Sequence, residues 1–348
     1  MPLLMQFFMP ATKQVVKRQW VRARKLMRSF LLKRYGLNAQ LLVNSDAPAC
    51  IRNIWVIGTG LFGISQGGPL LDLYGHPSWA LTDLRGRDFL RYKLVQLGLQ
   101  KAKTIERVVY LYHPYRGNYF HFVVQQLLYF TALPPEHQRG ILFTGLSSKL
   151  KPWQKRYLEL LDISTKQFLI LNQNYHIKEL IVLPQMPALT YSRRQLLVFR
   201  NRILMSLKNS PSFSKNQSWK RLFISRADAA SRKVLNEKEL LDALEPLGFR
   251  RVVLSEYSVD EQVALFHYAE FVVAPHGAGN TNILYSQQQT CFIELRLQES
   301  AQEDNYYKEL ASALKLNYQP FYSDYQDYDN NMAFSPAPIV DDLKKRIS

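Results

Sequence analysis

The sequence predicts an α/β protein with two domains, and three observations lead to that prediction. The chain has 348 residues, of which 47% are hydrophobic, so it can bury a sizeable core. From Arg221 onward, apolar runs of about five residues alternate with amphipathic stretches of about ten or more, as in repeated strand–helix units. A polar stretch at 208–219, with Pro211 and four serines, has the composition of a linker between the two halves.

The second half, residues 220–325, shows the strand–helix alternation most clearly. Such alternation predicts a parallel sheet with helices on its faces, and residues 326–348 would follow as a tail and a helix. Strands are expected at 222–225, 251–254, 271–274, 291–295 and about 318–322, and helices at 236–247, 259–270, after Gly279, and at 306–316.

The first half, residues 46–207, is less regular but of the same kind. We expect a second α/β domain here, with a cleft between the two domains. Strands are predicted at 108–112, 141–143, 168–171 and 180–183, and helices at 119–133, 153–161 and 192–207.

Two short motifs match known ligand sites in letters only. Residues 58–63 read GTGLFG, the dinucleotide-binding fingerprint, but that site needs a helix of useful length at the turn, and the GGP at 67–69 would stop it. We predict short strands joined by glycine turns instead. Residues 327–329 read DYD, a pattern that holds a divalent metal in many sugar transferases, but they lie in a Tyr- and Asp-rich segment after the last strand–helix unit. We predict a solvated loop and no metal there.

The net charge of +17 is concentrated near the start of the chain. Residues 1–45 contain nine Lys or Arg and no acid, which is about half of the excess. Residues 11–35 are predicted to form a basic helix. An anionic membrane surface would suit it, at about 1 kcal/mol per basic residue near the surface, and a solvated helix fits equally well. A nucleic-acid arm ranks third, because no zinc-finger or RNA-recognition signature occurs elsewhere.

Neither a membrane span nor a disulfide framework is predicted. The apolar stretch at 3–9 is too short to cross a bilayer, and the basic run follows it rather than preceding it, unlike a secretory signal. Cys50 and Cys291 lie far apart in different predicted domains. We therefore expect a cytoplasmic protein, peripheral at the inner membrane if the basic helix binds there.

The most informative segment is residues 271–282, FVVAPHGAGNTN. A buried strand is followed by small residues and then by residues that can open a helix. Glycines let the backbone approach a ligand closely, and the N–H groups of a first helical turn can bind an anion. We predict a phosphate site here; the alternative is a packed strand–helix turn with His276 in the core.

Other polar side chains follow the neighbouring predicted strands. Ser225 and Arg226 end one strand and Arg232 follows six residues later; guanidinium groups at this edge of a sheet can bind phosphate in bidentate fashion. Glu294, at the end of another strand, could accept hydrogen bonds from both hydroxyls of a ribose, or else form a buried ion pair with Arg296. His121 begins a helix and is a candidate base that would face the same cleft, although a lone histidine there is more often a packing residue.

Together these segments resemble glycosyltransferase family 61. The resemblance rests on RLFISRADAASRKVLNEKELLDALEPLGF, LSEYSVDEQVALFHYAEFVVAPHGAGNTNILY and CFIEL, with NYFH at 118–121 similar to the family's upstream histidine motif. It covers about residues 105–300. It implies a GT-B fold of two Rossmann-like domains and inverting transfer from a nucleotide sugar, commonly a uridine diphosphate sugar, with no metal or other cofactor. Bacterial relatives belong largely to capsule and surface-polysaccharide synthesis, which implies a glycan or lipid-linked glycan acceptor and no nucleic acid.

One position departs from the family pattern. Many members carry an acid four residues after the upstream histidine, where this chain has Gln125. His121 is therefore the preferred candidate base, with Asp228 and Glu261 as substitutes. A non-catalytic anion-binding module that docks on membranes or polysaccharide assemblies is the alternative outside enzymes, and a nucleotide-sugar epimerase is a further one. The expected donor-binding set is Ser225, Arg226, Arg232, His276, Gly277, Ala278, Gly279, Asn280, Asn282 and Glu294.

Overall fold

A computed structural model supplies the structure of this chain. The residues it describes are 40–41, 49–56, 63–65, 68–71, 93–110, 117–138, 141–143, 150–169, 173–182, 192–214, 218–297 and 305–347. The predicted basic helix at 11–35 lies outside these residues. No helix among the described residues is both long and apolar enough to cross a bilayer.

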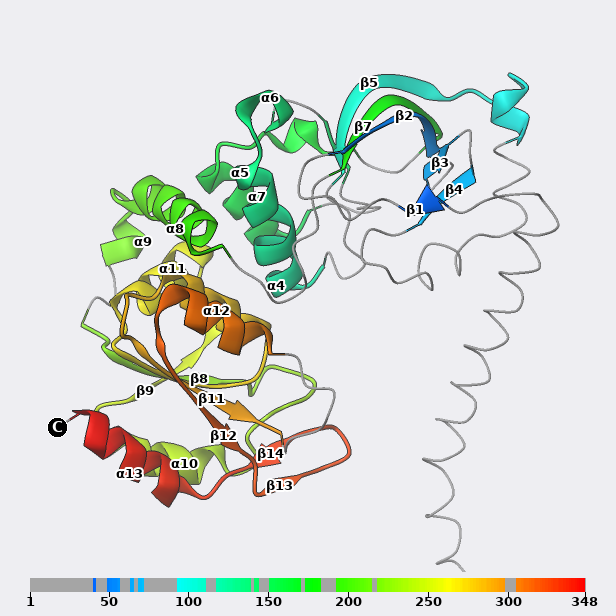
Figure 1. The fold of residues 1–348 in the computed structure, drawn as a ribbon. Coiled ribbons are helices and arrows are strands. Elements are labelled where there is room, and N and C mark those ends of the chain that lie inside the picture. The colour runs from blue at the N-terminus through cyan, green and yellow to red at the C-terminus, as the bar shows by residue number, and fades with distance from the viewer. Residues whose placement is uncertain are drawn as a thin grey trace, which may run out of the picture. The chain divides into compact units, whose positions relative to one another are not determined.

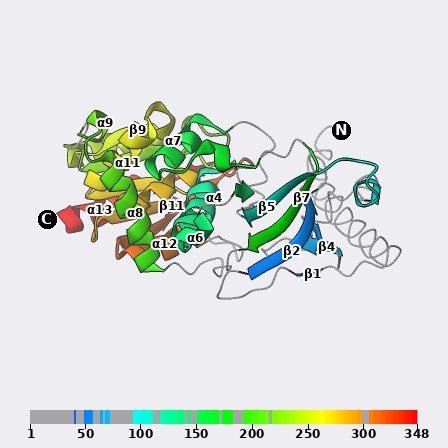
Figure 2. The same cartoon turned by 90° about the horizontal axis from the view of Figure 1, so that it is seen from above.

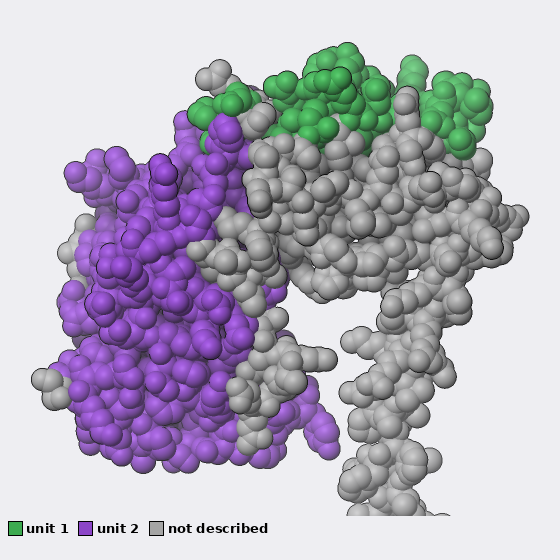
Figure 3. All heavy atoms as spheres, in the orientation of Figure 1, with its two compact units in different colours: residues 1–114, 135–149, 167–185 green, residues 115–134, 150–166, 186–348 purple. Residues whose placement is uncertain are grey.

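The chain divides into two compact units, coloured separately in Figure 3. Unit 1 comprises residues 1–114, 135–149 and 167–185, and unit 2 comprises 115–134, 150–166 and 186–348. The units interleave along the sequence. The helices expected at 119–133, 153–161 and 192–207 as parts of the first domain are therefore grouped in unit 2, with the second sheet.

Unit 1 contains a mixed seven-stranded sheet in the order β1-β4-β3-β2-β7-β5-β6, several strands of which lie side by side in Figure 2. β5, β6 and β7 run parallel, whereas β2 is antiparallel to β7 and β3. β3 and β4 occupy the place where a dinucleotide fingerprint would need a helix, as predicted. The strands are β1 (Gln40–Leu41), β2 (Ala49–Val56), β3 (Gly63–Ser65), β4 (Gly68–Leu71), β5 (Lys103–Tyr110), β6 (Ile141–Phe143) and β7 (Tyr175–Val182). The short helix α6 (Pro135–Gln138) precedes β6.

Two strands of unit 1 are longer than predicted because they carry polar residues. β7 begins at Tyr175 rather than at 180, and β5 at Lys103 rather than at 108. Arg107 and Glu179 face each other across these strands and form an ion pair at 2.8 Å. Such pairs stabilise a sheet but interrupt the apolar run on which the prediction relied. The predicted strand at 168–171 is reduced, within the described residues, to one bridge from Phe168 to Leu142 after a 3₁₀ turn.

Unit 2 contains a five-stranded parallel sheet in the order β12-β11-β10-β8-β9. α11 and α12 lie on one face, and α10 and α13 on the other (Figure 1). All five predicted strands are present to within about one residue of their predicted bounds. The elements are β8 (Arg221–Ser225), α10 (Glu237–Leu244), β9 (Arg250–Val253), α11 (Val259–Tyr268), β10 (Phe271–Pro275), β11 (Cys291–Arg296), α12 (Tyr306–Leu314), β12 (Asn317–Tyr322) and α13 (Pro336–Ile347).

Several shorter elements complete unit 2. The predicted short helix after Gly279 is the 3₁₀ helix η5, and the predicted linker contains a helical turn, α9. The predicted helix at 119–133 has a π-helical turn in its middle, η1. The remaining bounds are α4 (Tyr119–Phe122), η1 (Val123–Leu127), α5 (Leu128–Ala132), α7 (Pro152–Leu160), α8 (Arg193–Leu207), α9 (Pro211–Ser214), η5 (Ala278–Tyr285), β13 (Tyr325–Gln326) and β14 (Met332–Ala333).

The strand order of unit 2 indicates where a ligand would bind. Numbered along the chain, the five strands lie in the order 2-1-3-4-5, so the direction of the connections reverses between β8 and β10, which are hydrogen-bonded neighbours. Ligands of open parallel sheets bind outside the carboxyl ends of the strands at such a switch point. In this chain, the loops that follow Ser225 and Pro275 meet there.

Candidate active site

Arg226 lies directly over the glycine-rich loop at this switch point. A Cβ atom added to Gly277 would fall 2.8 Å from Cζ of Arg226, a distance that carbon atoms do not tolerate. Only glycine therefore lets the guanidinium group approach the loop backbone so closely. The structure thus brings together two predicted donor-binding features, the arginine after β8 and the glycine loop after β10.

The surroundings of Arg226 satisfy neither all of the hydrogen-bond donors nor the positive charge of its guanidinium group. It is half-buried, and burial lowers its pKa, with the positive charge of Arg232 acting in the same direction. Nη2 donates to the carbonyl of Ser231 at 3.1 Å, and Nε is buried without a hydrogen-bond partner among the described residues. A buried donor without a partner is costly. An anion bound here would offset both the missing hydrogen bond and the repulsion from Arg232.

Arg232 has an unusual backbone conformation. Its φ of 59° lies in the left-handed region, which residues other than glycine, asparagine and aspartate rarely adopt. The hydrogen bonds of the next residue hold this turn, since the backbone N–H of Lys233 donates to Oδ1 of Asn331 at 2.9 Å and its carbonyl accepts from the N–H of Met332 at 2.8 Å. The charge of Arg232 lowers the pKa of Arg226, and this closeness supports the assignment of Arg232 to the site.

His276 and Glu294 form a hydrogen-bonded pair at the carboxyl ends of β10 and β11. Nδ1 of His276 lies 2.7 Å from Oε1 of Glu294. The other carboxylate oxygen accepts from the hydroxyl of Tyr318 at 2.7 Å and lies 3.5 Å from Nη1 of Arg296. Glu294 has no exposed surface, so both of its oxygens serve protein groups in this structure. The ion pair with Arg296, the alternative to a ribose contact, is thus present, and Glu294 orients His276.

The residues that follow Gly277 brace the loop at the start of η5. The backbone N–H of Asn280 donates to Gly277 O at 2.9 Å, and its side-chain amide donates to Pro275 O at 3.2 Å. By helix geometry, the N–H groups of Ala278 and Gly279, in the first turn of η5, have no partner inside the helix. Of the predicted set, these two can bind an anion, whereas Asn280 holds the turn in shape.

His121 lies on the short helix α4, whose N-cap is Asn118. Its Nδ1 forms a short hydrogen bond with Oε1 of Gln125, which lies in the π-helical turn. With the amide oxygen as acceptor, Nδ1 carries the proton and Nε2 is the basic nitrogen. π turns within helices frequently mark functional sites. The residue that replaces the family's acid therefore still contacts the histidine, as a neutral acceptor.

Two contacts hold α4 against the loop after β10. The hydroxyl of Tyr119 donates to Oδ1 of Asn282 at 2.7 Å. The ring of Phe120 packs on that of Tyr307, with centroids 5.5 Å apart, and Tyr307 packs in turn on His276 at 5.2 Å. Within unit 2, the upstream histidine motif thus lies at the same edge of the sheet as the glycine loop.

Tyr307 is the site residue that the sequence reasoning missed. It is 4% exposed, and its hydroxyl interacts electrostatically with Glu294, Arg232 and Arg226. Burial raises the pKa of Tyr307, and the charge of Glu294 raises it further, so the hydroxyl stays protonated and can donate to a ligand. The available signal was an aromatic pair at the start of the helix that follows the strand with Glu294.

Beneath α4, a row of buried hydroxyl groups connects the helix to the loop. Tyr285 donates to Tyr157 at 2.9 Å, Tyr157 and Tyr119 lie 2.6 Å apart, and Tyr119 donates to Asn282. The amide of Asn282 continues the row to Oε1 of Gln262 at 3.0 Å. Burial raises the pKa of all three tyrosines, so they remain neutral donors. The fully buried Asn282 therefore fixes the loop in position.

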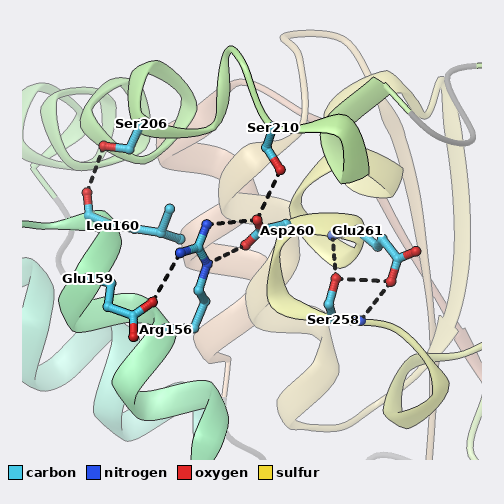
Figure 4. A network of polar contacts seen from close by, with 8 residues as sticks. All are labelled: Arg156, Glu159, Leu160, Ser206, Ser210, Ser258, Asp260 and Glu261. Atoms are coloured by element: carbon cyan, nitrogen blue, oxygen red, sulfur yellow. Dashed lines mark hydrogen bonds and ion pairs between the residues drawn. The ribbon is translucent and has the colours of Figure 1, made fainter.

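Glu261, a substitute candidate for the base, caps the N-terminus of α11 in this structure. It forms a capping box with Ser258, whose backbone N–H and hydroxyl donate to its Oε2 at 3.0 and 2.9 Å (Figure 4). The neighbouring Asp260 is buried and forms a bidentate ion pair with Arg156 of α7, with both distances 2.8 Å. These contacts tie α7 to α11 and stabilise the start of α11.

The two remaining candidates, Ser225 at the end of β8 and Asp228 on the loop after it, differ in exposure. Asp228 is exposed on the loop that carries Arg226. Ser225 is 3% exposed, and its hydroxyl lies 2.8 Å from both carboxylate oxygens of Glu237 and accepts from Arg251 at 3.0 Å. Ser225 therefore fixes the end of β8, with its side chain turned to Glu237 and Arg251.

No three His, Cys, Asp or Glu side chains cluster as metal ligands would within the described part of the chain. Asp327, the first residue of the DYD sequence, accepts from the backbone N–H groups of Asp329 and Asn331 at 2.9 and 2.8 Å and from the side-chain amide of Asn331 at 2.9 Å. These bonds, led by the one from the Asn331 amide, lower the pKa of Asp327. Its carboxylate builds the loop that was predicted here.

Comparison with known proteins identifies one family. The model described as Glycosyltransferase 61 matches residues 119–293, half of the chain. The match begins two residues before His121 and ends one residue before Glu294, so it spans Arg226, Arg232 and the glycine loop. A search among curated proteins found no match.

Proposed function

The chain belongs to glycosyltransferase family 61, and we propose that it transfers a sugar from a nucleotide diphosphate sugar, a uridine diphosphate sugar by preference, to a glycan acceptor with inversion. The observation that supports this most strongly is the close approach of Arg226 to Gly277 at the switch point of a parallel sheet. A half-buried guanidinium group with an unsatisfied N–H, beside a second arginine and a helical first turn, has the chemistry of a diphosphate site.

On the donor side, the leaving diphosphate would contact Arg226, Arg232 and the N–H groups of Ala278 and Gly279. As the bond from the anomeric carbon to the diphosphate oxygen breaks, these fixed groups would stabilise the negative charge that develops on that oxygen, without a metal ion. In its imidazolium form, with both ring nitrogens protonated, His276 would donate from Nδ1 to Glu294 and from Nε2 to the diphosphate. This proposal moves Glu294 from ribose binding to positioning.

On the acceptor side, Nε2 of His121 would take the proton of the attacking hydroxyl. The acceptor oxygen forms its bond to the anomeric carbon on the face opposite the diphosphate, so a single displacement inverts that centre. Gln125 would hold the ring in the required tautomer through its hydrogen bond with Nδ1. Glu261 is engaged in a helix cap and Asp228 is exposed, which leaves His121 as the preferred base.

The remaining features of the proposal follow from the family. They are a GT-B arrangement of two domains, a role in surface or capsular polysaccharide synthesis, and action in the cytoplasm with residues 11–35 at an anionic membrane surface. The mixed sheet of unit 1 differs from the parallel sheet of the Rossmann-like first domain that we expected. The 2-1-3-4-5 order of the second sheet supports a nucleotide-binding domain of this kind.

Calorimetric titration with uridine diphosphate, with and without a chelator, tests the donor site directly. We expect micromolar binding that the chelator does not change and that Arg226→Ala abolishes. Met205→Ala, an exposed change on α8, is the control and should bind normally. Absence of binding to the intact protein would reject a uridine diphosphate donor, and binding that needs a divalent metal would reject the metal-free mechanism.

A non-catalytic anion-binding module is the second candidate, favoured by the amide of Gln125 in place of an acid. Such a module would bind the nucleotide equally well. Release of nucleotide diphosphate from a sugar donor separates the two, because a module releases none. An epimerase would bind the same donor and also release none, but it would change the sugar.

A further inference from the structure

We propose that the acceptor glycan binds an aromatic hairpin, residues 322–333, that borders the donor site. Tyr322, Tyr325 and Tyr328 are 42%, 56% and 100% exposed. They are the exposed tyrosines among all side chains that the structure describes. The inference rests on the proposed transfer reaction and assigns its acceptor to unit 2.

The hairpin is a built structure that presents its tyrosines from a fixed backbone. β13 and β14 pair in antiparallel fashion, Tyr325 opposite Ala333. Three hydrogen bonds to the carboxylate of Asp327 close the loop that carries Tyr328. Met332 is fully buried in the core beneath α10 and α13. The backbone that carries these rings is therefore already ordered before a ligand binds.

Both ends of the hairpin are bonded to segments of the donor site. The N–H of Leu235 donates to Met332 O at 2.7 Å, and Met332 N–H donates to the carbonyl of Lys233, the residue after Arg232. At the other end, the N–H of Ser323 donates to Arg296 O at 2.8 Å, two residues after Glu294. The hairpin, orange-red in Figure 1, therefore spans from the end of β12 to the segment after β8, along the carboxyl edge of the sheet.

The chemistry of this surface suits a neutral glycan. Tyrosine combines an apolar ring, which can cover the C–H face of a sugar, with a hydroxyl that can bond a sugar hydroxyl. The exposed acids Asp324 and Asp329 lie among the tyrosines and would repel a phosphate or an anionic membrane. The adjacent donor site requires a sugar hydroxyl as its second substrate.

The test compares the double variant Tyr325→Ala/Tyr328→Ala with Tyr325→Phe/Tyr328→Phe and with Met205→Ala, an exposed change elsewhere in unit 2. The probes are octyl glycosides of common hexoses, pentoses and N-acetylhexosamines. Direct binding is read by saturation-transfer NMR, and acceptor KM, kcat and donor hydrolysis by product analysis. We expect the alanine pair to weaken glycoside binding and raise acceptor KM by about 10-fold or more, while uridine diphosphate binding, donor hydrolysis and the melting temperature stay unchanged.

The phenylalanine pair keeps the rings and should retain most of the binding, as should Met205→Ala. Saturation transfer that is equal in wild type and alanine pair would overturn the proposal, as would wild type that binds none of the glycosides. Self-association of the wild type that the alanine pair abolishes would identify the hairpin as a contact between copies and also overturn it. If the wild type binds glycosides through the hairpin but neither binds nor hydrolyses a donor, the proposed reaction fails and the glycan surface stands.

Discussion

The two histidines of the site are built differently. His276 follows a central strand, and its Nδ1 contacts a fully buried carboxylate that is itself held by Tyr318 and Arg296. His121 lies on a short helix, and its Nδ1 contacts the amide of Gln125. Both rings thus have one nitrogen fixed by the protein, but one partner carries a charge and the other does not. The difference matches two tasks, since a carboxylate partner favours the protonated ring that can bind an anion, whereas the amide of Gln125 fixes the tautomer of His121 without adding charge.

The largest effect should come from the acceptor side. We expect His121→Ala to lower turnover by about 10²- to 10⁴-fold, because a positioned general base contributes that much, while calorimetric binding of uridine diphosphate stays normal. Wild-type turnover in this variant would remove His121 from the chemistry and leave Asp228 as the candidate. Reduced nucleotide binding would show instead that His121 acts on the donor side, and the contrast between the histidines would be wrong.

On the donor side, Arg226→Ala should lower turnover by about 100-fold or more and nucleotide binding with it, because it removes charge from the leaving group. Gly277→Ala is a matched change that keeps Arg226 in the sequence but displaces its side chain, since the new methyl group would clash with the guanidinium group. Both variants should fold, as judged by circular dichroism and melting. A Gly277→Ala protein with normal nucleotide affinity would show that Arg226 need not lie over the loop.

The sequence predicted the strands and helices of unit 2, but not the contacts between distant residues that build the site. Short apolar strands and the glycine loop are local signals, so the five strands, Arg226 and the loop were found from the residues. The partners of Glu294, Asn280 and Asn282 come from distant segments, and no local pattern reports that a carboxylate is covered by Tyr318 and His276. Tyr307 was missed for the same reason, because its importance comes from the rings and charges around it.

The sequence likewise did not predict that α4, α7 and α8 belong with the second sheet. Their amphipathic patterns predicted helices but not the surface against which they pack. Buried polar contacts such as Tyr119 to Asn282 and Arg156 to Asp260 hold them there, and each joins residues more than about a hundred positions apart.

Glu294→Gln would give His276 a neutral amide partner at Nδ1, as His121 already has in Gln125. We expect turnover per folded molecule to fall by about 10-fold, because His276 loses its charged partner. The variant should also lose stability, because the buried guanidinium group of Arg296 loses the negative charge of Glu294. Tyr318→Phe is the control, since it removes one hydrogen bond to the same carboxylate at a cost of about 1 kcal/mol and keeps its charge. Urea unfolding and initial rates measure the two effects separately, and equal rates in both variants would show that the charge of Glu294 has no part in turnover.

Gln125→Glu approaches the same comparison from the other side and should have the smallest effect at neutral pH. The new carboxylate can accept from Nδ1 as the amide does, so we expect turnover to stay within about 10-fold of wild type. A carboxylate beside the ring favours the protonated imidazole. Because a base must be unprotonated to act, the acid limb of the pH–rate profile should move to higher pH, and activity should be lost sooner as the pH falls. The complete profile measures this shift. A profile that coincides with that of the wild type would mean that the ring of His121 does not titrate in the rate-limiting step, so that the amide at position 125 matters for packing alone.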